Sequence, residues 1–328
     1  MKQKLIDLSH GSGGKQTSDL IGQMFMEAYG NEILGRMEDA AVLDMDGPIA
    51  YTTDSFVVTP MFFPGGDIGK LAICGTVNDL AVMGASPKYL TAGFILEAGA
   101  SMEDLKKITE TMGAMAHKAG IKIVAGDTKV VEGSGNIYIN TSGIGVIRKK
   151  GISIHNCKEG DVILLSGNLG EHHAAILSKR MGIENEIQSD CAPLCHLTQA
   201  LIEANLDIHC MRDVTRGGLA TVLNEVADSS HCQVTIEEQK IPVSNEVDGF
   251  CQILGLDPLY MANEGKLIVV LPKDQAAQAL EQMKQQEYGE NAVIIGEITA
   301  GEGVHMKTRF GGLRRVDLLY GEGLPRIC

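Results

Sequence analysis

Residues 68–84 read IGKLAICGTVNDLAVMG, a strongly apolar stretch that is long enough for about four turns of helix. Asn78 and Asp79 lie inside this stretch. A carboxylate buried in such a helix needs a polar partner or a metal ion, because the charged form is costly to remove from water. The stretch therefore predicts a core helix that carries a functional acid.

Helical and strand patterns alternate on both sides of this helix. Ser101 is expected to cap a helix that ends before Gly120. Alternation in both halves predicts an α/β or α+β chain of two domains. The further helices are expected at residues 17–29, from about 171, at 218–227 and at 273–286, and the strands at 38–45, 49–53, 88–96, 121–125, 137–147, 161–165, 267–271 and 292–298.

A basic segment that contains glycine, RKKG at 148–151, interrupts the pattern near the middle of the chain. We place the domain boundary there, which gives an N-terminal domain at 1–150 and a C-terminal domain at 151–310. Residues 311–328 form a tail that ends in Cys328 and contains two glycine-rich points, at 311–312 and 321–323. Because glycine permits many backbone conformations, this tail is expected to swing between two positions.

Composition excludes several classes of protein. The chain has 328 residues and a net charge of −14, which argues against a nucleic-acid binder, because such proteins present a basic face. No apolar run is long enough to span a bilayer, and the first residues do not follow a secretory pattern. Eight scattered cysteines in such a chain favour reduced thiols over disulfides. We expect a soluble cytoplasmic protein that does not bind membranes.

The glycine-rich segment HGSGGK at 10–15 is a candidate phosphate-binding loop. Glycines such as Gly13 and Gly14 let the backbone approach an anion, and His10 and Lys15 offer polar and positive groups. It is neither a P-loop nor a dinucleotide fingerprint, because the required residues are missing at their positions. A flexible N-terminal loop explains this segment equally well.

Four acids occupy unusual positions in or beside apolar segments. Asp54 and Asp127 follow predicted strands, Asp79 lies in the apolar helix, and Asp39 precedes a short apolar run. A single acid at a strand end is usually a turn residue. Four of them without a matching basic pattern suggest Mg²⁺ held by carboxylates and by the oxygens of a triphosphate.

Residues 211–219 read MRDVTRGGL and precede a predicted helix. Asp213, Arg216 and the two glycines could form an anion site at the start of this helix. A capped helix with surface arginines is the alternative. The glycines favour the anion site, because they lower the stability of a helix.

These motifs occur in an order that resembles an ATP-binding superfamily over nearly the whole chain. The superfamily includes aminoimidazole ribonucleotide synthetase, selenophosphate synthetase and thiamine-monophosphate kinase. Within it, the ending PRIC at 325–328 resembles the HypE family of [NiFe]-hydrogenase maturation factors, which are carbamoyl dehydratases, and GDTKV at 126–130 and NEG at 263–265 agree with it. Selenophosphate synthetases carry a reactive cysteine or selenocysteine beside the glycine-rich loop. This chain has SGG there, at 12–14, which argues against selenophosphate synthesis.

The resemblance implies a homodimer in which the N-terminal sheets pair into a β-barrel flanked by helices, with the C-terminal half an α/β sandwich. It implies ATP and Mg²⁺ near Asp54, Asp79 and Asp127, with the other motif residues, Asn78 among them, around the nucleotide. It also implies a carbamoyltransferase partner, HypF, that loads Cys328, and a HypC–HypD complex that receives the cyanide.

The chemistry follows from the thiocarbamate. An S-carbamoyl group loses water only if its oxygen becomes a leaving group, which phosphoryl transfer from ATP achieves, and a base must then remove the N–H protons. The resemblance assigns Glu264 and Lys129 to proton handling and developing charge. Two alternatives stay open: a small-molecule kinase or ATP-dependent cyclase of the same superfamily, and a non-catalytic scaffold that offers Cys328 as a thiol.

Overall fold

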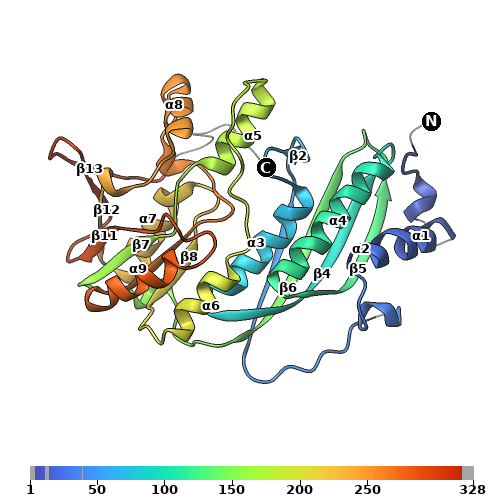
Figure 1. Ribbon diagram of the computed structural model, residues 1–328, viewed down its shortest axis with the longest axis horizontal. Coiled ribbons are helices and arrows are strands. Elements are labelled where there is room, and N and C mark those ends of the chain that lie inside the picture. The colour runs from blue at the N-terminus through green and yellow to red at the C-terminus, as the bar shows by residue number, and fades with distance from the viewer. Residues whose placement is uncertain (1–3, 12–14, 39, 320–328) are drawn as a thin grey trace.

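A computed structural model describes residues 4–11, 15–38 and 40–319. Two units lie side by side, each a sheet covered by helices (Figure 1). The first unit contains a four-stranded sheet and the second a seven-stranded sheet. None of the helices in these described stretches combines the length and the apolar character that crossing a bilayer requires.

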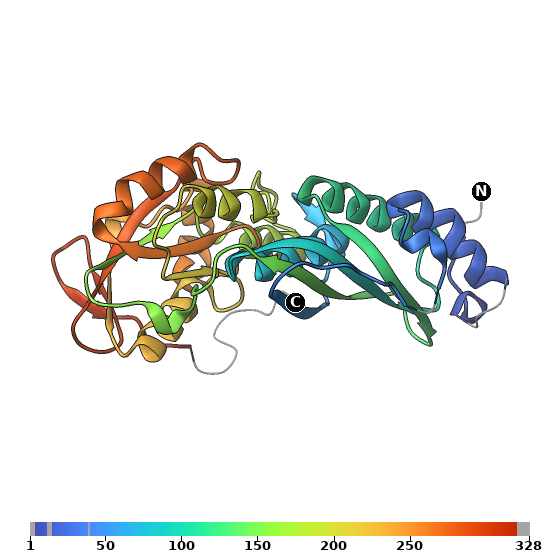
Figure 2. The same cartoon turned by 90° about the horizontal axis from the view of Figure 1, so that it is seen from below.

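The first sheet carries helices on one face. Figure 2 shows these helices on one side of the sheet and the opposite face turned away from them. Exposed apolar side chains, Tyr51, Ile95 and Val131, lie on strands of this sheet. In strand order the sheet comprises β1 (Ile49–Phe56), β6 (Ile137–Ile147), β4 (Ala85–Glu97) and β5 (Lys122–Val131), and the covering helices are α3 (Ile68–Val82) and α4 (Met102–Ala119).

The apolar stretch at 68–84 forms α3, as its sequence predicts. Asp67 caps the helix, since its carboxylate accepts a hydrogen bond from the backbone N–H of Lys70 at 2.9 Å. Thirteen of the fifteen residues of α3 are buried. The cap predicted for α4 is also present: Ser101 accepts from Asp104 N at 3.2 Å, and Gly120 ends the helix with φ at +68°.

Residues 15–29 form a helical segment that packs against α4. The segment consists of α1 (Lys15–Leu20), a π-helical turn η2 (Ile21–Phe25) and α2 (Met26–Tyr29). Phe25 anchors it by stacking on Phe94 of β4 with ring centroids 5.0 Å apart. The strand expected at 38–45 is wrong for the described residues there: Ala40, Ala41 and Val42 line a pocket instead of pairing in a ladder.

The second sheet separates two apolar layers. Alternate residues of its strand β7 (Asp161–Leu165) face the two layers: Ile163 and Leu165 pack with α7 (Gly218–Ser230), while Val162 and Leu164 pack with α6 (Cys195–Glu203) and α9 (Ala276–Lys284). In sheet order the strands are β13 (Leu313–Arg315), β12 (Val304–Lys307), β9 (Gln233–Glu237), β11 (Val293–Thr299), β7, β10 (Leu267–Pro272) and β8 (Cys210–Asp213).

The two units meet where α3 packs against β8 and α6. The mixed α/β class with two layered units is therefore confirmed. Within one chain the four-stranded sheet is open, with β1 and β5 at its edges. The predicted pairing into a barrel requires a second copy and stays a prediction.

Candidate functional site

An acidic pocket of about 190 Å³ lies at the junction of the two units. Its carboxylates come from four separate segments: Asp54 from β1, Asp79 from α3, Asp213 from the end of β8 and Glu264 from the loop before β10. Arg216 supplies a positive charge at the same pocket. The remaining lining residues are Ser55, Phe56, Val57, Leu71, Gly75 and Thr215.

Asp54 and Asp79 face each other because α3 lies close against β1. A side chain at Gly75 would bring its Cβ within 2.9 Å of the Phe56 ring, so glycine is needed for this approach. Thr52, two residues before Asp54 and on the same face of the strand, donates a hydrogen bond from Oγ1 to Asp79 Oδ2 at 2.8 Å. Burial, and then the negative charge of Asp79, raise the pKa of Asp54 to about 6, and the positive charge of Arg216 opposes this shift.

Asp213 is the last residue of β8 and is 8% exposed. Burial raises its pKa to about 7, and the charge of Asp79 adds to the effect while Arg212 opposes it. The chain then turns tightly at Gly217 and Gly218, which have φ of +78° and +65°. A Cβ at Gly218 would lie 2.4 Å from a backbone oxygen, so this turn requires glycine. The turn brings Arg216 into the acidic pocket.

The Glu264 carboxyl is also perturbed by its surroundings. Burial raises its pKa well above the ordinary value, and the nearby charges of Asp190 and Asp213 raise it further. Such a carboxyl holds a proton at neutral pH more readily than a surface glutamate does. It is therefore suited to take up and release a proton during a reaction.

Asn78 has a different environment from the one that the sequence suggests. Its side chain is 2% exposed and lies among backbone groups rather than along the pocket. Its Oδ1 accepts from Leu194 N at 2.7 Å, and its Nδ2 donates to Ala192 O at 3.0 Å and to Glu264 O at 3.4 Å. Asn78 thus ties α3 to two loops of the second unit.

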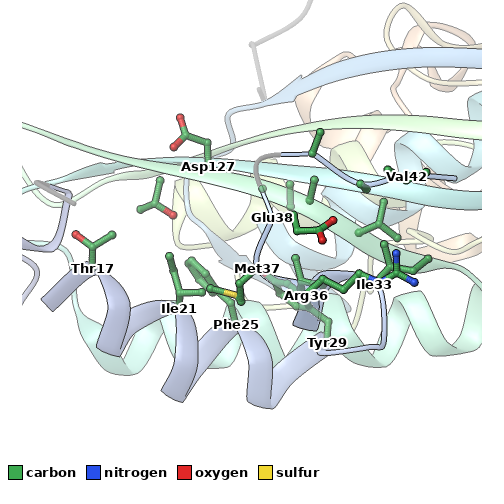
Figure 3. A pocket seen from close by; sticks show the side chains of 18 residues that line it. Thr17, Ile21, Phe25, Tyr29, Ile33, Arg36, Met37, Glu38, Val42 and Asp127 are labelled. Atoms are coloured by element: carbon green, nitrogen blue, oxygen red, sulfur yellow. The ribbon is translucent and has the colours of Figure 1, made fainter. Parts of the chain in front are cut away.

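A second pocket, of about 230 Å³, lies between the N-terminal helical segment and β5. Figure 3 shows apolar side chains of the helical segment, Ile21 and Phe25 among them, directed toward the strands above. Asp127 lies on the strand with its carboxylate turned away from these side chains (Figure 3). We call this the helix pocket.

Within one chain, Asp127 does not join Asp54 and Asp79. Its pairing runs through Gly93 and Asn140 to Ser55, so three strand spacings, about 14 Å, separate it from β1. Paired residues point to the same face of a sheet, so Asp127 shares a face with Ser55 and lies opposite to the face that carries Asp54. The sequence showed that both acids are associated with strands, but it did not show this register.

Lys129 lies on the same face as Asp127, and its Nζ contacts Asp127 Oδ1 at 3.0 Å. A hydrogen bond from Lys129 is the main cause of the lowered pKa of Asp127. Lys129 is therefore separate from Glu264 within one chain, although the resemblance assigns the two residues to one reaction.

The start of the glycine-rich segment packs on β5. Gly11 approaches Val130 so closely that a Cβ would lie 2.6 Å from its backbone nitrogen. His10 Nδ1 lies 3.0 Å from Asp7 Oδ1, and Lys15 opens α1 as an exposed residue. Gly13, Gly14, Asp39 and Cys328 lie outside the described residues.

The acidic pocket meets the requirements of a magnesium–phosphate site better than those of a protein-only metal site. Among the residues that the structure describes, no three His, Cys, Asp or Glu side chains converge closely enough to hold a metal ion. Mg²⁺ is commonly bound by one or two carboxylates, with phosphate oxygens and waters completing the shell. The facing pair Asp54 and Asp79 fits that pattern, because a cation would relieve the repulsion that raises the pKa of Asp54.

Three residues that support this site were not predicted from the sequence. Thr52 donates to Asp79, Asp190 accepts from the Glu264 backbone, and Lys266 pairs with Asp190. Thr52 could have been found from its two-residue spacing to Asp54 along a strand. Asp190 had no local signal, because it lies in a loop 74 residues away from Glu264.

Known proteins resemble the chain over its full length. Models of the N-terminal and C-terminal domains of the AIR synthase related proteins match residues 37–147 and 158–308. The carbamoyl dehydratase HypE of Rhodobacter capsulatus is 47% identical over 339 residues, which cover 100% of this chain and 99% of that protein.

Two solved structures show the same likeness. A crystal structure of the hydrogenase maturation protein HypE in complex with ATP has a TM-score of 0.95 at 45% identity, covering 98% of this chain and 99% of that one. A crystal structure of a HypE–HypF complex has a TM-score of 0.80 at 50% identity, covering 92% and 99%. This degree of identity over complete chains goes well beyond a shared fold, and the chain belongs to the HypE family of carbamoyl dehydratases.

Proposed function

We propose that the protein dehydrates an S-carbamoyl group on Cys328 to a thiocyanate at the expense of ATP. The product would supply the cyanide ligand for the iron of [NiFe]-hydrogenase. The observation that carries the proposal is the half-buried Glu264 carboxyl, with its raised pKa, in the acidic pocket beside Asp54 and Asp79. This arrangement provides a proton acceptor next to a place where Mg-ATP can bind.

Asp54 and Asp79 would hold Mg²⁺, which would shield the negative charge of the triphosphate. Arg216 would contact phosphate oxygens, since it lines the same pocket. Asp213 adds a carboxyl on the side of the second unit. Asp39, His10, Gly13, Gly14 and Lys15 remain proposed nucleotide contacts.

The proposed dehydration of the S-carbamoyl group has two steps. The γ-phosphoryl group of ATP moves to the carbamoyl oxygen, and ADP leaves. Two N–H protons are then removed while the C–O bond breaks and phosphate departs, leaving S–C≡N on the sulfur. Glu264 would accept one of these protons, because burial raises its pKa and makes its ionised carboxylate a stronger base than a surface glutamate, and the other proton would leave on the departing phosphate.

The tail is long enough to bring Cys328 to this pocket. The first part of the segment expected as a tail is not free, because residues 313–315 pair in the second sheet as β13. The hydroxyl of Tyr260 then donates to Asp317 O at 2.9 Å, which fixes the chain at Asp317 near the Glu264 loop. Tyr260 precedes Glu264 by four residues, at most about 14 Å of extended chain, whereas the eleven residues after Asp317 can span about 36 Å. The distance that the proposal requires is therefore within reach.

Asp127 and Lys129 fit the proposal through a second copy of the chain. Both lie on the face of the first sheet that no described helix covers, together with the exposed Ile95. A homodimer that pairs these faces would bring the two residues to a shared boundary. We propose that this boundary completes the nucleotide site.

The partners follow from the same proposal. A HypE chain that is 50% identical has been crystallised with HypF, and we propose that HypF carbamoylates Cys328 here as well. Transfer of the cyanide to a HypC–HypD complex and a cytoplasmic location are further parts of the proposal.

Removing Cys328 and replacing Glu264→Gln test the proposal together. A self-modifying dehydratase loses its product completely when Cys328 is deleted, while ATP binding persists. A kinase or cyclase that acts on a small molecule keeps its turnover without Cys328, which would contradict the proposal. Thiocyanate formation at the wild-type rate in Glu264→Gln would exclude Glu264 as the base.

A further inference from the structure

The backbone of Glu264 is clamped by a carboxylate that does not line the acidic pocket. Asp190 Oδ1 accepts from Glu264 N at 3.1 Å, and Asp190 Oδ2 accepts from Gly265 N at 3.1 Å. The Asp190 side chain is 1% exposed and lines a separate cavity of about 260 Å³ behind the loop. It therefore contacts the Glu264 main chain without lining the acidic pocket.

A buried lysine holds Asp190 in turn. Lys266 Nζ lies 3.3 Å from Asp190 Oδ2 and 3.5 Å from Glu171 Oε2, and its side chain is only 10% exposed. A buried carboxylate without a cation would be strongly disfavoured. Lys266 thus pairs a cation with the Asp190 carboxylate, and a carboxylate is a stronger acceptor for backbone N–H groups than a neutral oxygen is.

The other side of the same peptide is also fixed. Glu264 O accepts from Ala192 N at 3.3 Å and from Asn78 Nδ2 at 3.4 Å. Gly265 fits so closely that a Cβ would lie 1.9 Å from the backbone oxygen of Asp190. The Glu264 peptide consequently has little freedom, and the direction of its side chain is set by its neighbours.

We infer that Asp190, held by Lys266, is a positioning residue for the dehydration step. It acts by aiming the Glu264 carboxyl into the pocket, without touching ATP or the thiocarbamate. The inference rests on the proposed role of Glu264. Since a displacement of about 1 Å at a reacting group can cost about 100-fold in rate, loss of the clamp should slow the reaction by about 10- to 100-fold.

The test uses full-length protein with a carbamoylated tail and measures single-turnover thiocyanate formation, Mg-ATP affinity and melting temperature. Asp190→Asn keeps the shape but offers one oxygen to two N–H donors. Lys266→Met removes the cation, and Lys266→Arg restores it. Glu97→Gln is the matched control, because Glu97 also accepts from two backbone N–H groups, of Ser134 and Asn136, at the far end of β4.

We expect Asp190→Asn and Lys266→Met to lower the rate about 10- to 100-fold with ATP affinity within about twofold of wild type. Lys266→Arg should recover most of the rate, and Glu97→Gln should change the melting temperature without changing the rate. In a Glu264→Gln background, Asp190→Asn should cause no further loss, since the group that it positions is gone.

Additive losses in the double variant would overturn the inference, as would equal losses in rate and ATP affinity. An unchanged rate in Asp190→Asn would also overturn it. If Glu264→Gln alone retains the full rate, the proposed function of Glu264 fails instead, so the two failures are distinguishable.

Discussion

Replacing Asp213 by asparagine should stabilise the metal-free protein above neutral pH while impairing its function. The pKa of Asp213 rises from 3.8 to about 7 on folding, mainly through burial. The native state therefore binds more protons than the unfolded state between about pH 4 and pH 7. The stabilising contribution of protonated Asp213 is present below about pH 4 and is lost as the pH rises through about 7.

The size of the effect follows from the shift. A difference of about 3 pKa units, at about 1.4 kcal/mol per unit, corresponds to about 4 kcal/mol that the ionised carboxylate costs at pH 8. Relaxation and water entry reduce this, so we expect Asp213→Asn to gain about 2–4 kcal/mol at pH 8 and almost nothing at pH 4.

Urea unfolding in EDTA at pH 5, 6, 7 and 8 measures this gain. Glu97→Gln is a control of opposite sign, because backbone hydrogen bonds lower the pKa of Glu97 from 4.5 to about 2 and its charge is therefore stabilising above pH 4.5. The gain in Asp213→Asn should grow with pH and shrink when Mg-ATP is added to the wild type. A gain that is independent of pH, or a loss of stability at pH 8, would refute the electrostatic reasoning for the pocket.

Three further predictions concern the residues around the pocket. Asn78→Ala should lower the free energy of unfolding, measured in urea, by about 3–5 kcal/mol, because three hydrogen bonds of a buried amide are lost. A loss of ATP affinity without destabilisation would contradict this structural role. Gly265→Ala should lower the free energy of unfolding by about 3 kcal/mol, because its Cβ would meet backbone atoms. Gly249→Ala, in a helix with open space around it, should be neutral or slightly stabilising. Equal effects of the two variants in thermal melts would argue against close packing at Gly265. Asp79→Asn should weaken ATP binding, measured by calorimetry, at least about tenfold in the presence of Mg²⁺ but only slightly in EDTA. An equal weakening in the two buffers would count against a role of Asp79 in binding magnesium.

Local sequence patterns predicted α3, which carries Asp79, and several of the elements around it. The apolar stretch at 68–84, the Ser101 cap and the strands at 137–147 and 161–165 all have strong local signals, and each is present. Other elements, such as α6 and β8, were not assigned as a helix and a strand, because their patterns are short and tertiary packing stabilises them.

The sequence did not predict how the acidic residues are arranged in space. Asp54 and Asp127 both lie on strands, but only the register of the ladder shows that they face opposite sides of the sheet. The family resemblance placed Asn78 at the nucleotide together with its neighbour Asp79, yet successive helical residues point in different directions. The contact of Asp190 with Glu264 could not be predicted, because it joins two loops that are 74 residues apart in the sequence.

Intact mass spectrometry of the carbamoylated protein with Mg-ATP follows the dehydration of the tail itself. We expect the full chain to lose the mass of one water, the loss to map to the peptide containing Cys328, and the loss to require ATP. A carbamoylated tail that keeps its mass while ATP is hydrolysed, or a loss of water that maps elsewhere, would contradict this expectation.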